Sequence, residues 1–403
     1  MGGAMNAAAT GMHVTETELQ LVGDNLANMQ SVGFKETSGI FGEIYAQTVT
    51  GAAAAANGRG GVNPITMGAG ATLLGEQINQ NQGAITPDGN PTNMAINGAG
   101  FFVLDSGGGG QVYTRNGAFT LTAGGHLAAS NGMYVMGYNA TNGVLPASGS
   151  QVLQDLQIPM NAQGVPAATQ KASWTGNLDP NRTTPYTDTG TVFDAQGNAI
   201  QMQVKFTPTG SNTWSWTVTG PTGATGSGTV TFTSAGAYSA STGGPISVPG
   251  VGGSPSLSIT PTLTGLTQFA TSTSAVMSSQ DGYPAGQPKS LSVSSNGVVA
   301  ISYNNGQTMT VGQVAMAGFA NASGLQGGSQ GIFKQSPASG IASIGVANSG
   351  GRGAISPDSL EGSNVSLTQQ FVTMIQAQHA FEADSQVLNA QGLMDTSLGQ
   401  VQV

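Results

Sequence analysis

This chain has few charged residues and no cysteine. Asp, Glu, Lys and Arg make up 7% of its 403 residues, against about 25% in ordinary globular proteins. The absence of cysteine excludes disulfides, thiolate metal ligands and thiol nucleophiles. The nine basic residues form no cluster, which argues against binding to nucleic acid or to anionic membranes. Several large classes of function are therefore excluded before any motif is considered.

Long apolar runs are also missing. No stretch approaches the roughly 18 apolar residues that a membrane-spanning helix needs. The opening residues, MGGAMNA, lack the basic and apolar segments of a secretory signal peptide. We therefore expect no membrane insertion, and either a cytoplasmic location or export without a cleaved signal.

Glycine and small uncharged polar residues take the place of the missing charges. The chain has 63 glycines, and Ser, Thr, Asn, Gln and Ala fill much of the remainder. A neutral polar surface lets copies of a protein pack together without like-charge repulsion. The composition therefore favours a self-associating structural protein. It leaves open a glycine-rich secreted β-protein that stays monomeric.

The N-terminal segment has the pattern of an amphipathic helix. Two columns of mostly apolar residues, each with a seven-residue repeat, predict a coiled-coil-like seam. Gly33 follows the pattern, at a place where helices often end. The first column contains Met5, Met12, Leu19 and Leu26, and the second contains Ala8, Thr15, Val22 and Met29.

The C-terminal segment repeats this pattern less regularly. Ser366 to Gln369 fit a capping box, which predicts a helix start. The second column decays into polar residues, so we expect this helix to pack against several neighbouring copies. Because neither helix can bury its apolar stripe alone, both are predicted to drive polymerisation. The alternative is that they are ordinary core helices of one globular domain. The main column contains Leu367, Met374, Phe381 and Leu388, and Phe371 widens the stripe.

The long region between the helices carries the signals of β-structure. Asn116-Gly117 predicts a hairpin in which residues 119–121 pair back on 112–115. Similar turns are predicted at Gly124-Gly125, Asn131-Gly132, Asn296-Gly297 and Asn305-Gly306. We therefore predict a multidomain, mainly β fold with α-helical termini that pair as a coiled-coil-like inner domain. The predicted domains are a terminal helical domain (1–35 and 361–403), a connecting segment (36–88), a discontinuous β-domain (89–145 and 285–360) and an inserted all-β outer domain (146–284).

Three motifs in the same chain resemble those of a known family. Residues 25–35 (NLANMQSVGFK) resemble the N-terminal signature of the bacterial flagellar axial proteins, the rod and hook family. Residues 113–119 (YTRNGAF) are similar to its core hairpin, and residues 360–378 are similar to its C-terminal signature. The residues that carry these motifs are Asn25, Asn28, Gly33, Phe34, Lys35, Tyr113, Arg115, Gly117, Phe119, Ser363, Asn364 and Val365.

The resemblance implies a subunit of a hollow helical tube outside the cell. Terminal helices would line the inner tube, and β-domains would form the outer layers. The insert at 146–284 resembles that of the hook-forming members, which implies a flexible curved hook that joins the rod to the filament. Such a hook transmits motor torque as a universal joint in motility. The alternatives are a distal rod subunit of the same family and, less favoured, a secreted β-rich adhesin or hydrolase.

The resemblance also implies partners and an export route. Besides copies of itself, the partners would be the distal rod protein, the hook cap protein during assembly and the hook–filament junction protein. Export would proceed through the flagellar type III apparatus without a cleaved signal, which places the chain extracellularly in the basal body–hook structure.

The sequence offers little that could carry catalysis. His13, His126 and His379 fall in separate elements without neighbours at metal-ligand spacing. Residues 327–331 match the G-x-S-x-G nucleophile pattern around Ser329, which is the main support for a hydrolase. No helical pattern follows Ser329, however, so we attribute the match to the abundance of Gly and Ser. We predict no catalytic, cofactor-binding or metal site, and no enzyme.

Overall fold

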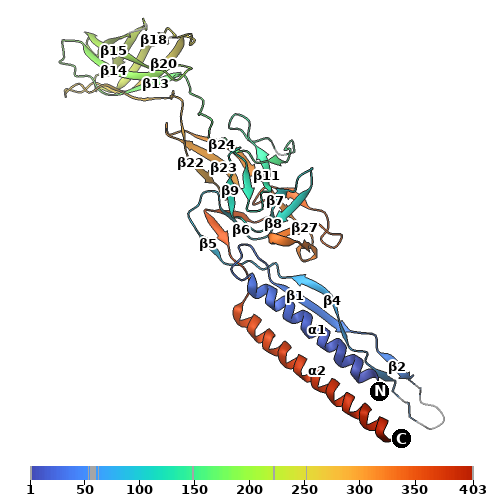
Figure 1. The fold of residues 1–403 in the computed structure, drawn as a ribbon. Coiled ribbons are helices and arrows are strands. Elements are labelled where there is room, and N and C mark those ends of the chain that lie inside the picture. Colours follow the sequence, from blue (N-terminus) through green and yellow to red (C-terminus); the bar gives the residue numbers. More distant parts are fainter. Residues whose placement is uncertain are drawn as a thin grey trace. The chain divides into compact units, whose positions relative to one another are not determined.

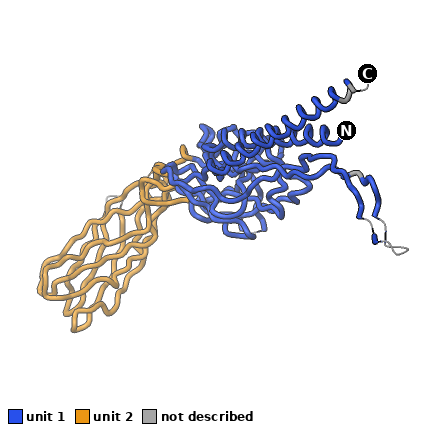
Figure 2. Tube along the Cα trace, turned by 90° about the horizontal axis from the view of Figure 1, so that it is seen from below, with its two compact units in different colours: residues 1–159, 291–300, 310–403 blue, residues 160–290, 301–309 orange. Residues whose placement is uncertain are grey.

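The computed structural model describes residues 2–401, apart from 53, 55–59, 62, 148, 221–222 and 251. The chain forms two compact units, which Figure 2 shows in different colours. Unit 1 comprises residues 1–159, 291–300 and 310–403, and unit 2 comprises residues 160–290 and 301–309. The fold is mainly β with one helix at each end of the chain, which confirms the prediction of a mainly β fold with α-helical termini (Figure 1).

The two terminal helices of unit 1 lie side by side (Figure 1). Helix α1 spans Gly2–Ala27, and helix α2 spans Leu367–Val401, directly after Ser366. Neither contains proline, so no interruption of the backbone hydrogen bonds shortens them. Met29, the last member of the predicted N-terminal seam, lies in the turn that follows α1.

An extended arm follows α1 in unit 1. Its base is the antiparallel pair β1 (Thr37–Glu43) and β4 (Ala71–Ile78), and its outer part is the pair β2 (Gln47–Thr50) and β3 (Ile65–Met67). The Ala71 N–H donates to Thr10 Oγ1 at 3.3 Å, which ties the arm to α1. Residues 51–58 form a low-complexity stretch of mostly Ala and Gly, for which the sequence predicts a loop, and they fall largely outside the described residues.

The rest of unit 1 is built on an antiparallel sheet. Within it β24, β11, β7, β8, β27 and β26 follow one another as neighbours. Phe101 packs edge-on against Phe319 and Phe333 in the core of this unit. Two further pairs, β6 with β29 and β5 with β30, form separate two-stranded sheets. The strands of this part of unit 1 are β5 (Ile85–Pro87), β6 (Met94–Asn97), β7 (Phe101–Asp105), β8 (Gln111–Thr114), β9 (Phe119–Leu121), β10 (Leu127–Ala129), β11 (Tyr134–Asn139), β12 (Gln154–Asp155), β25 (Met316–Gly318), β26 (Gln326–Gly327), β27 (Ile332–Lys334), β28 (Ser343–Gly345), β29 (Ala354–Pro357) and β30 (Ser359–Glu361).

Three strands have residues in both units, namely β22 (Pro288–Val293), β23 (Val298–Tyr303) and β24 (Thr308–Val314). Two short 3₁₀ turns, η1 (Ala322–Gly324) and η2 (Ser329–Gly331), complete unit 1. The predicted turns at Asn296-Gly297 and Asn305-Gly306 join β22 to β23 and β23 to β24. Glycine suits these turns because φ is +77° at Gly297 and +82° at Gly306.

The hairpin predicted at Asn116-Gly117 is wrong. Strand β8 pairs with β7 and β27, whereas β9 pairs with β10 across the Gly124-Gly125 turn. The chain does not fold back because Gly117 packs on the adjacent β6 residue. The Met94 N–H donates to the Gly117 carbonyl at 3.0 Å, and a Cβ at Gly117 would collide with the Met94 carbonyl. Tertiary packing therefore overrides the local turn signal.

Unit 2 is a pair of sheets around one core. One sheet has the order β14-β15-β16-β17-β18 and the other has the order β19-β20-β13-β21. Alternate residues along β15 and β16 are buried, as their period-2 pattern predicts. All three tryptophans, Trp174, Trp214 and Trp216, are buried in this core. The strands are β13 (Lys171–Asn177), β14 (Tyr186–Phe193), β15 (Ala199–Gly210), β16 (Thr213–Thr219), β17 (Gly226–Phe232), β18 (Tyr238–Gly243), β19 (Ile246–Val248), β20 (Leu257–Thr267) and β21 (Val276–Gln280).

Candidate functional site

Three buried charges bring the three sequence motifs together in unit 1. Lys35 Nζ lies 2.6 Å from Glu361 Oε1, and Arg115 Nη1 lies 3.2 Å from Glu361 Oε2. Lys35 follows α1, Arg115 follows β8, and Glu361 ends β30, so each motif contributes one member. We call Lys35, Arg115 and Glu361 the charge triad.

The triad is satisfied mainly by backbone groups. Lys35 Nζ also donates to the Asn81 carbonyl at 2.8 Å, and Glu361 Oε1 accepts from the Gly83 N–H at 3.0 Å. Arg115 donates to the Gly98 carbonyl at 2.7 Å and to the Ile96 carbonyl at 3.3 Å. These bonds supply most of the partners that buried charges need, although the buried Arg115 Nε has no hydrogen-bond partner.

Burial sets the electrostatics of the triad. It lowers the pKa of Lys35 and of Arg115 because it disfavours their charged forms, while Glu361 opposes both shifts. Two cations face one carboxylate, so Glu361 is the residue whose loss leaves the most charge uncompensated. Removing one partner of a buried ion pair costs on the order of 3–5 kcal/mol.

Gly33 of the first motif packs directly against the backbone of the second motif. Its φ of +70° favours glycine, and a Cβ there would lie 2.6 Å from the Arg115 carbonyl carbon. Its N–H donates to the Glu361 carbonyl at 2.7 Å, so Gly33 touches the second motif and bonds to the third. Glycine therefore suits position 33 for two reasons: it adopts the positive φ easily, and it has no Cβ to collide with the Arg115 backbone.

A chain of side-chain hydrogen bonds extends from this region to both helices. Asn25 in the last turns of α1 donates to Gln370 Oε1 at 3.3 Å, and Gln370 Nε2 donates to Glu36 Oε1 at 2.7 Å. Asn364 accepts from the Glu36 N–H at 2.8 Å and donates to the Asn79 carbonyl at 2.8 Å. We call these residues, together with the charge triad and Gly33, the motif junction. It fixes the end of α1 and the start of α2 to the β-strands of unit 1.

The predicted seams are only partly buried within one chain. In α1 the column containing Ala8, Thr15 and Val22 is buried, whereas the column from Met5 to Leu26 is partly exposed. In α2 the members Leu367, Phe371 and Phe381 are exposed, whereas Met374 and Leu388 are half-buried. A groove of about 540 Å³ remains beside the helices, lined by Ala9, Met12, His13, Glu16, Leu19, Phe381 and Leu388.

The remaining motif residues have structural places near the junction or in the core. Tyr113 and Phe119 are buried in unit 1, and Phe34 is half-buried. Ser363 Oγ accepts from the Val365 N–H at 3.3 Å in the approach to α2. Glu361 is the functional residue that the list of motif residues omits. Only its place beside Gly362 and Ser363 in the C-terminal motif could have drawn attention to it.

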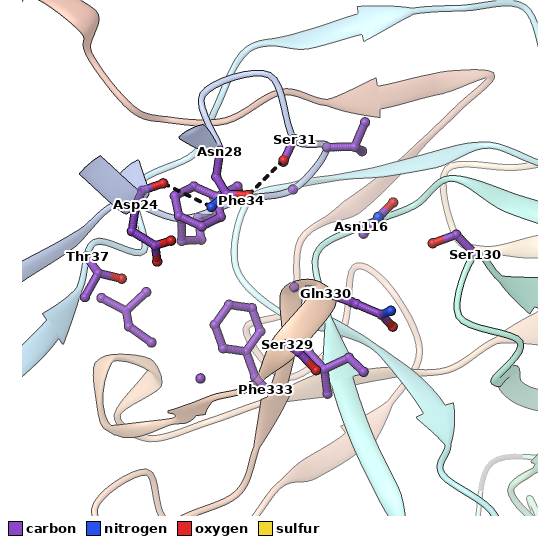
Figure 3. Close-up of a pocket in the computed structure, with 18 of the residues that line it drawn as sticks. Asp24, Asn28, Ser31, Phe34, Thr37, Asn116, Ser130, Ser329, Gln330 and Phe333 are labelled. Carbon is purple, nitrogen blue, oxygen red and sulfur yellow. Dashed lines mark hydrogen bonds between the residues drawn. The ribbon is translucent and has the colours of Figure 1, made fainter. Parts of the chain in front are cut away.

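A polar cavity of about 600 Å³ lies next to the junction (Figure 3). Asn28, Ser31, Asn116, Ser329 and Gln330 are among the residues that line it. Asn28 Nδ2 donates to the Asp24 carbonyl at 3.0 Å, and the Ser31 hydroxyl donates to Asn28 Oδ1 at 3.1 Å. Two phenylalanines, Phe34 and Phe333, also line the cavity.

Ser329 lacks the surroundings of a nucleophile. It begins the 3₁₀ turn η2 between β26 and β27, so no helix follows it. His379 lies on α2 and is not among the residues that line the cavity. Within the described part of the chain, no group of three or more His, Asp or Glu side chains is placed to hold a metal. No described helix is long and apolar enough to cross a membrane.

Three family models match the chain. A model described as the flagellar hook protein FlgE/F/G D1 domain matches residues 95–170. The flagellar basal body protein FlaE D2 domain matches residues 159–283, and the flagellar basal body rod FlgEFG protein C-terminal model matches residues 357–401. The last match includes Glu361 and α2.

Similar proteins cover almost the whole chain. The flagellar hook protein FlgE of Treponema pallidum is 30% identical over 97% of this chain and 98% of its own length. The FlgE of Escherichia coli is 29% identical over 96% of this chain and 97% of its own length. A crystal structure of Helicobacter pylori flagellar hook protein FlgE2 aligns with a TM-score of 0.49 and 16% identity, over 67% of this chain and 98% of that one.

Proposed function

The chain belongs to the flagellar hook protein family, and we propose that its copies assemble through their terminal helices into the hollow, curved tube of the hook. The family is one of structural proteins. A hook subunit is favoured over a rod subunit because the relatives that match almost the whole chain are hook proteins. Assembly through helices would make this chain the subunit of a flexible joint in motility.

The partly buried helix seams are the observation that supports this assembly. Phe371 is 45% exposed and Ile375 is 52% exposed on the same stretch of α2. Burying apolar surface stabilises a contact by roughly 25 cal/mol per Å². A contiguous apolar stripe beside an open groove is typical of a protein interaction site. A helix from another copy would fill the groove between Met12, Leu19, Phe381 and Leu388.

The arm offers a second surface for contacts between copies. Tyr45 is 86% exposed, and other large apolar side chains of the arm are also exposed. Two-stranded ribbons are marginal alone, so such an arm gains from a neighbouring surface. These side chains are Ile40, Tyr45, Val49, Ile65, Met67 and Leu74.

The motif junction would give the assembled helices a fixed direction relative to the β-strands of unit 1. It holds both helices by buried charges and amides, which break less readily than exposed contacts. In the proposed tube the helices form the inner layer and unit 2 belongs to the outer layers. Such a tube would join the distal rod to the filament and transmit torque as a universal joint.

The remaining proposals concern export and partners. We infer export by the flagellar type III apparatus without a cleaved signal, and an extracellular place in the basal body–hook structure. The proposed neighbours are the distal rod protein, the hook cap protein during assembly and the hook–filament junction protein. Family membership supports these proposals.

The helix-driven assembly is tested by one substitution on each side of the groove. Leu19→Asp and Phe381→Asp place a charge in the proposed contact, and burial of an unpaired charge is costly. We expect either variant to raise the subunit concentration needed for tube formation at least tenfold, measured by sedimentation and electron microscopy.

Gln203→Asp and Thr217→Asp are the charge controls because both residues are exposed on strands of unit 2 and neither lines the groove beside the helices. They add the same charge and should leave assembly within about twofold. Normal tubes from both Leu19→Asp and Phe381→Asp would contradict the proposed contact.

A further inference from the structure

The charged side chains of the two terminal helices are all acidic, and each helix also carries one histidine. Neither helix contains Lys or Arg. Each has three carboxylates, which at neutral pH give six negative charges for every copy of the chain. The ionisable residues are His13, Glu16, Glu18 and Asp24 on α1, and His379, Glu382, Asp384 and Asp395 on α2.

The strands that pack against α1 add no positive charge. Strand β1 contributes Glu43 and β4 contributes Glu76, and neither strand contains Lys or Arg. Lys35, which follows α1, is buried against Glu361 in the charge triad. The two histidines are therefore the ionisable groups on these packed elements that could become positive near neutral pH.

Carboxylates already lie where the helices meet. Asp384 of α2 packs against Gly11 of α1, so that a Cβ at Gly11 would collide with the carboxylate. Burial raises the pKa of Glu18 on α1 because it disfavours the charged carboxylate. Packing further helices onto these surfaces would bring more carboxylates together and repel them.

Each histidine is paired with a carboxylate on its own helix. His13 Nδ1 lies 3.7 Å from Glu16 Oε2, and His379 Nδ1 lies 3.5 Å from Glu382 Oε2. Both pairs are exposed in the single chain, and His13 and Glu16 line the groove beside the helices. An exposed pair of this kind is screened by water, but it strengthens when a neighbour covers it.

We propose that His13 and His379 become protonated in the contacts between the helices of neighbouring copies, so that assembly takes up protons. This inference rests on the proposed helix-driven assembly. The carboxylates of adjoining helices stabilise the imidazolium form, and each imidazolium offsets one negative charge in the contact. Because an ordinary histidine titrates near pH 6.5, the uptake is effective around neutral pH.

The sign of the pH dependence follows from this arrangement. In the proposed tube, carboxylates of neighbouring helices join the one on the histidine's own helix, so proton binding is more favourable there than in the free subunit. The favourable contribution is then complete below the pKa of the free subunit. It is lost as the pH rises through the pKa of the assembled state. The tube is therefore stabilised by mild acid and weakened by mild alkali.

The experiment measures the concentration of unassembled subunit at equilibrium with tubes, at constant ionic strength, from about pH 5.5 to about pH 8.5, a range that brackets the ordinary histidine pKa. Each proton taken up should change this concentration by up to about tenfold per pH unit. We expect it to rise with pH for the natural sequence. The double variant His13→Gln/His379→Gln should remove most of the slope.

His126→Gln is the control, because His126 stacks on Tyr134 in the β-part of unit 1. It should keep the slope of the natural sequence. A second variant, His13→Lys/His379→Lys, carries fixed positive charges and should form tubes at high pH with little slope. This variant keeps the test decisive if the glutamine variant does not assemble.

The outcomes separate this inference from the proposed function. Tubes with an unchanged slope in the glutamine variant, or lysine variants that do not assemble at high pH, would overturn the histidine inference and leave helix-driven assembly standing. Failure of the natural sequence to form tubes at any pH would overturn the proposed function itself.

Discussion

The two units of this chain differ in net charge and in how much apolar surface each leaves exposed. Unit 2 contains four acidic and four basic residues, so its net charge is zero, and its three tryptophans are buried between two sheets. Unit 1 contains fourteen acidic and five basic residues, and therefore carries the whole net charge of −9. Its helices leave apolar stripes partly exposed. Unit 2 buries its large aromatic side chains within its own core, whereas unit 1 leaves apolar helix surface that a neighbouring chain could cover.

Loss of the Glu361 carboxylate should give the largest difference between the stability changes of the two units. Glu361→Gln leaves Lys35 and Arg115 buried without a counter-charge, and we expect a loss of about 3–5 kcal/mol in the stability of unit 1. Helix content from circular dichroism during denaturation reports on unit 1. Tryptophan fluorescence reports on unit 2, because all three tryptophans lie there.

Glu382→Gln is the matched control for this variant, since Glu382 is exposed on α2. It should change neither transition by more than about 0.5 kcal/mol. A Glu361→Gln variant whose helix signal melts like that of the natural chain would show that the triad is not needed for stability.

A glycine substitution separates the junction from the helix surface. Gly33→Ala introduces a Cβ at φ +70° against the Arg115 backbone, and we expect a loss of about 1–3 kcal/mol in unit 1. Gly23→Ala places the same methyl in open space on α1 and should stabilise the helix by about 0.5–1 kcal/mol. Opposite signs in denaturant midpoints are the expected result, and equal effects would contradict the role given to Gly33.

A smaller effect is expected in acid from Asp194, a buried carboxylate of unit 2. Burial would raise the pKa of Asp194, but hydrogen bonds from Asn198 and from the Gln196 N–H outweigh it and lower the pKa. The carboxylate then stabilises unit 2 above its ordinary pKa, and this contribution is lost as the pH falls through the lowered value.

Asp194→Asn should therefore cost about 1 kcal/mol at neutral pH and progressively less in strong acid, followed by tryptophan fluorescence. Thr217→Asn, an exposed position on β16, is the control and should leave the pH profile of the natural chain intact. An Asp194→Asn variant with that same profile would remove Asp194 as the source of acid sensitivity.

Local patterns in the sequence were enough to predict much of the fold. The heptad columns locate both helices, and the Asn-Gly and Gly-Gly turns at 124–125, 296–297 and 305–306 join strands as expected. These features depend on residues a few positions apart. The hairpin at Asn116-Gly117 failed because Gly117 is held by Met94 on another strand. The division into four domain segments stays a prediction.

The motif junction could not be predicted in the same way. Lys35, Arg115 and Glu361 are far apart in the chain, and no periodicity relates them. The motifs identified Lys35 and Arg115 as residues of interest, but not that one carboxylate joins them. The sequence predicted that the seams need partners, but not which of their residues stay exposed in one chain, because a heptad shows which residues favour burial and not which chain covers them.

The absence of Lys and Arg from the helices has a practical consequence for proteolysis. The first basic residue in the chain is Lys35 and the last is Arg352. Trypsin, which cleaves after these residues, therefore has no site within either helix. A complete digest should release the whole of α1 in one peptide that ends at Lys35, and the whole of α2 in one that begins at Gly353. In the folded chain Lys35 is buried, so delayed cleavage there would report directly on an intact junction.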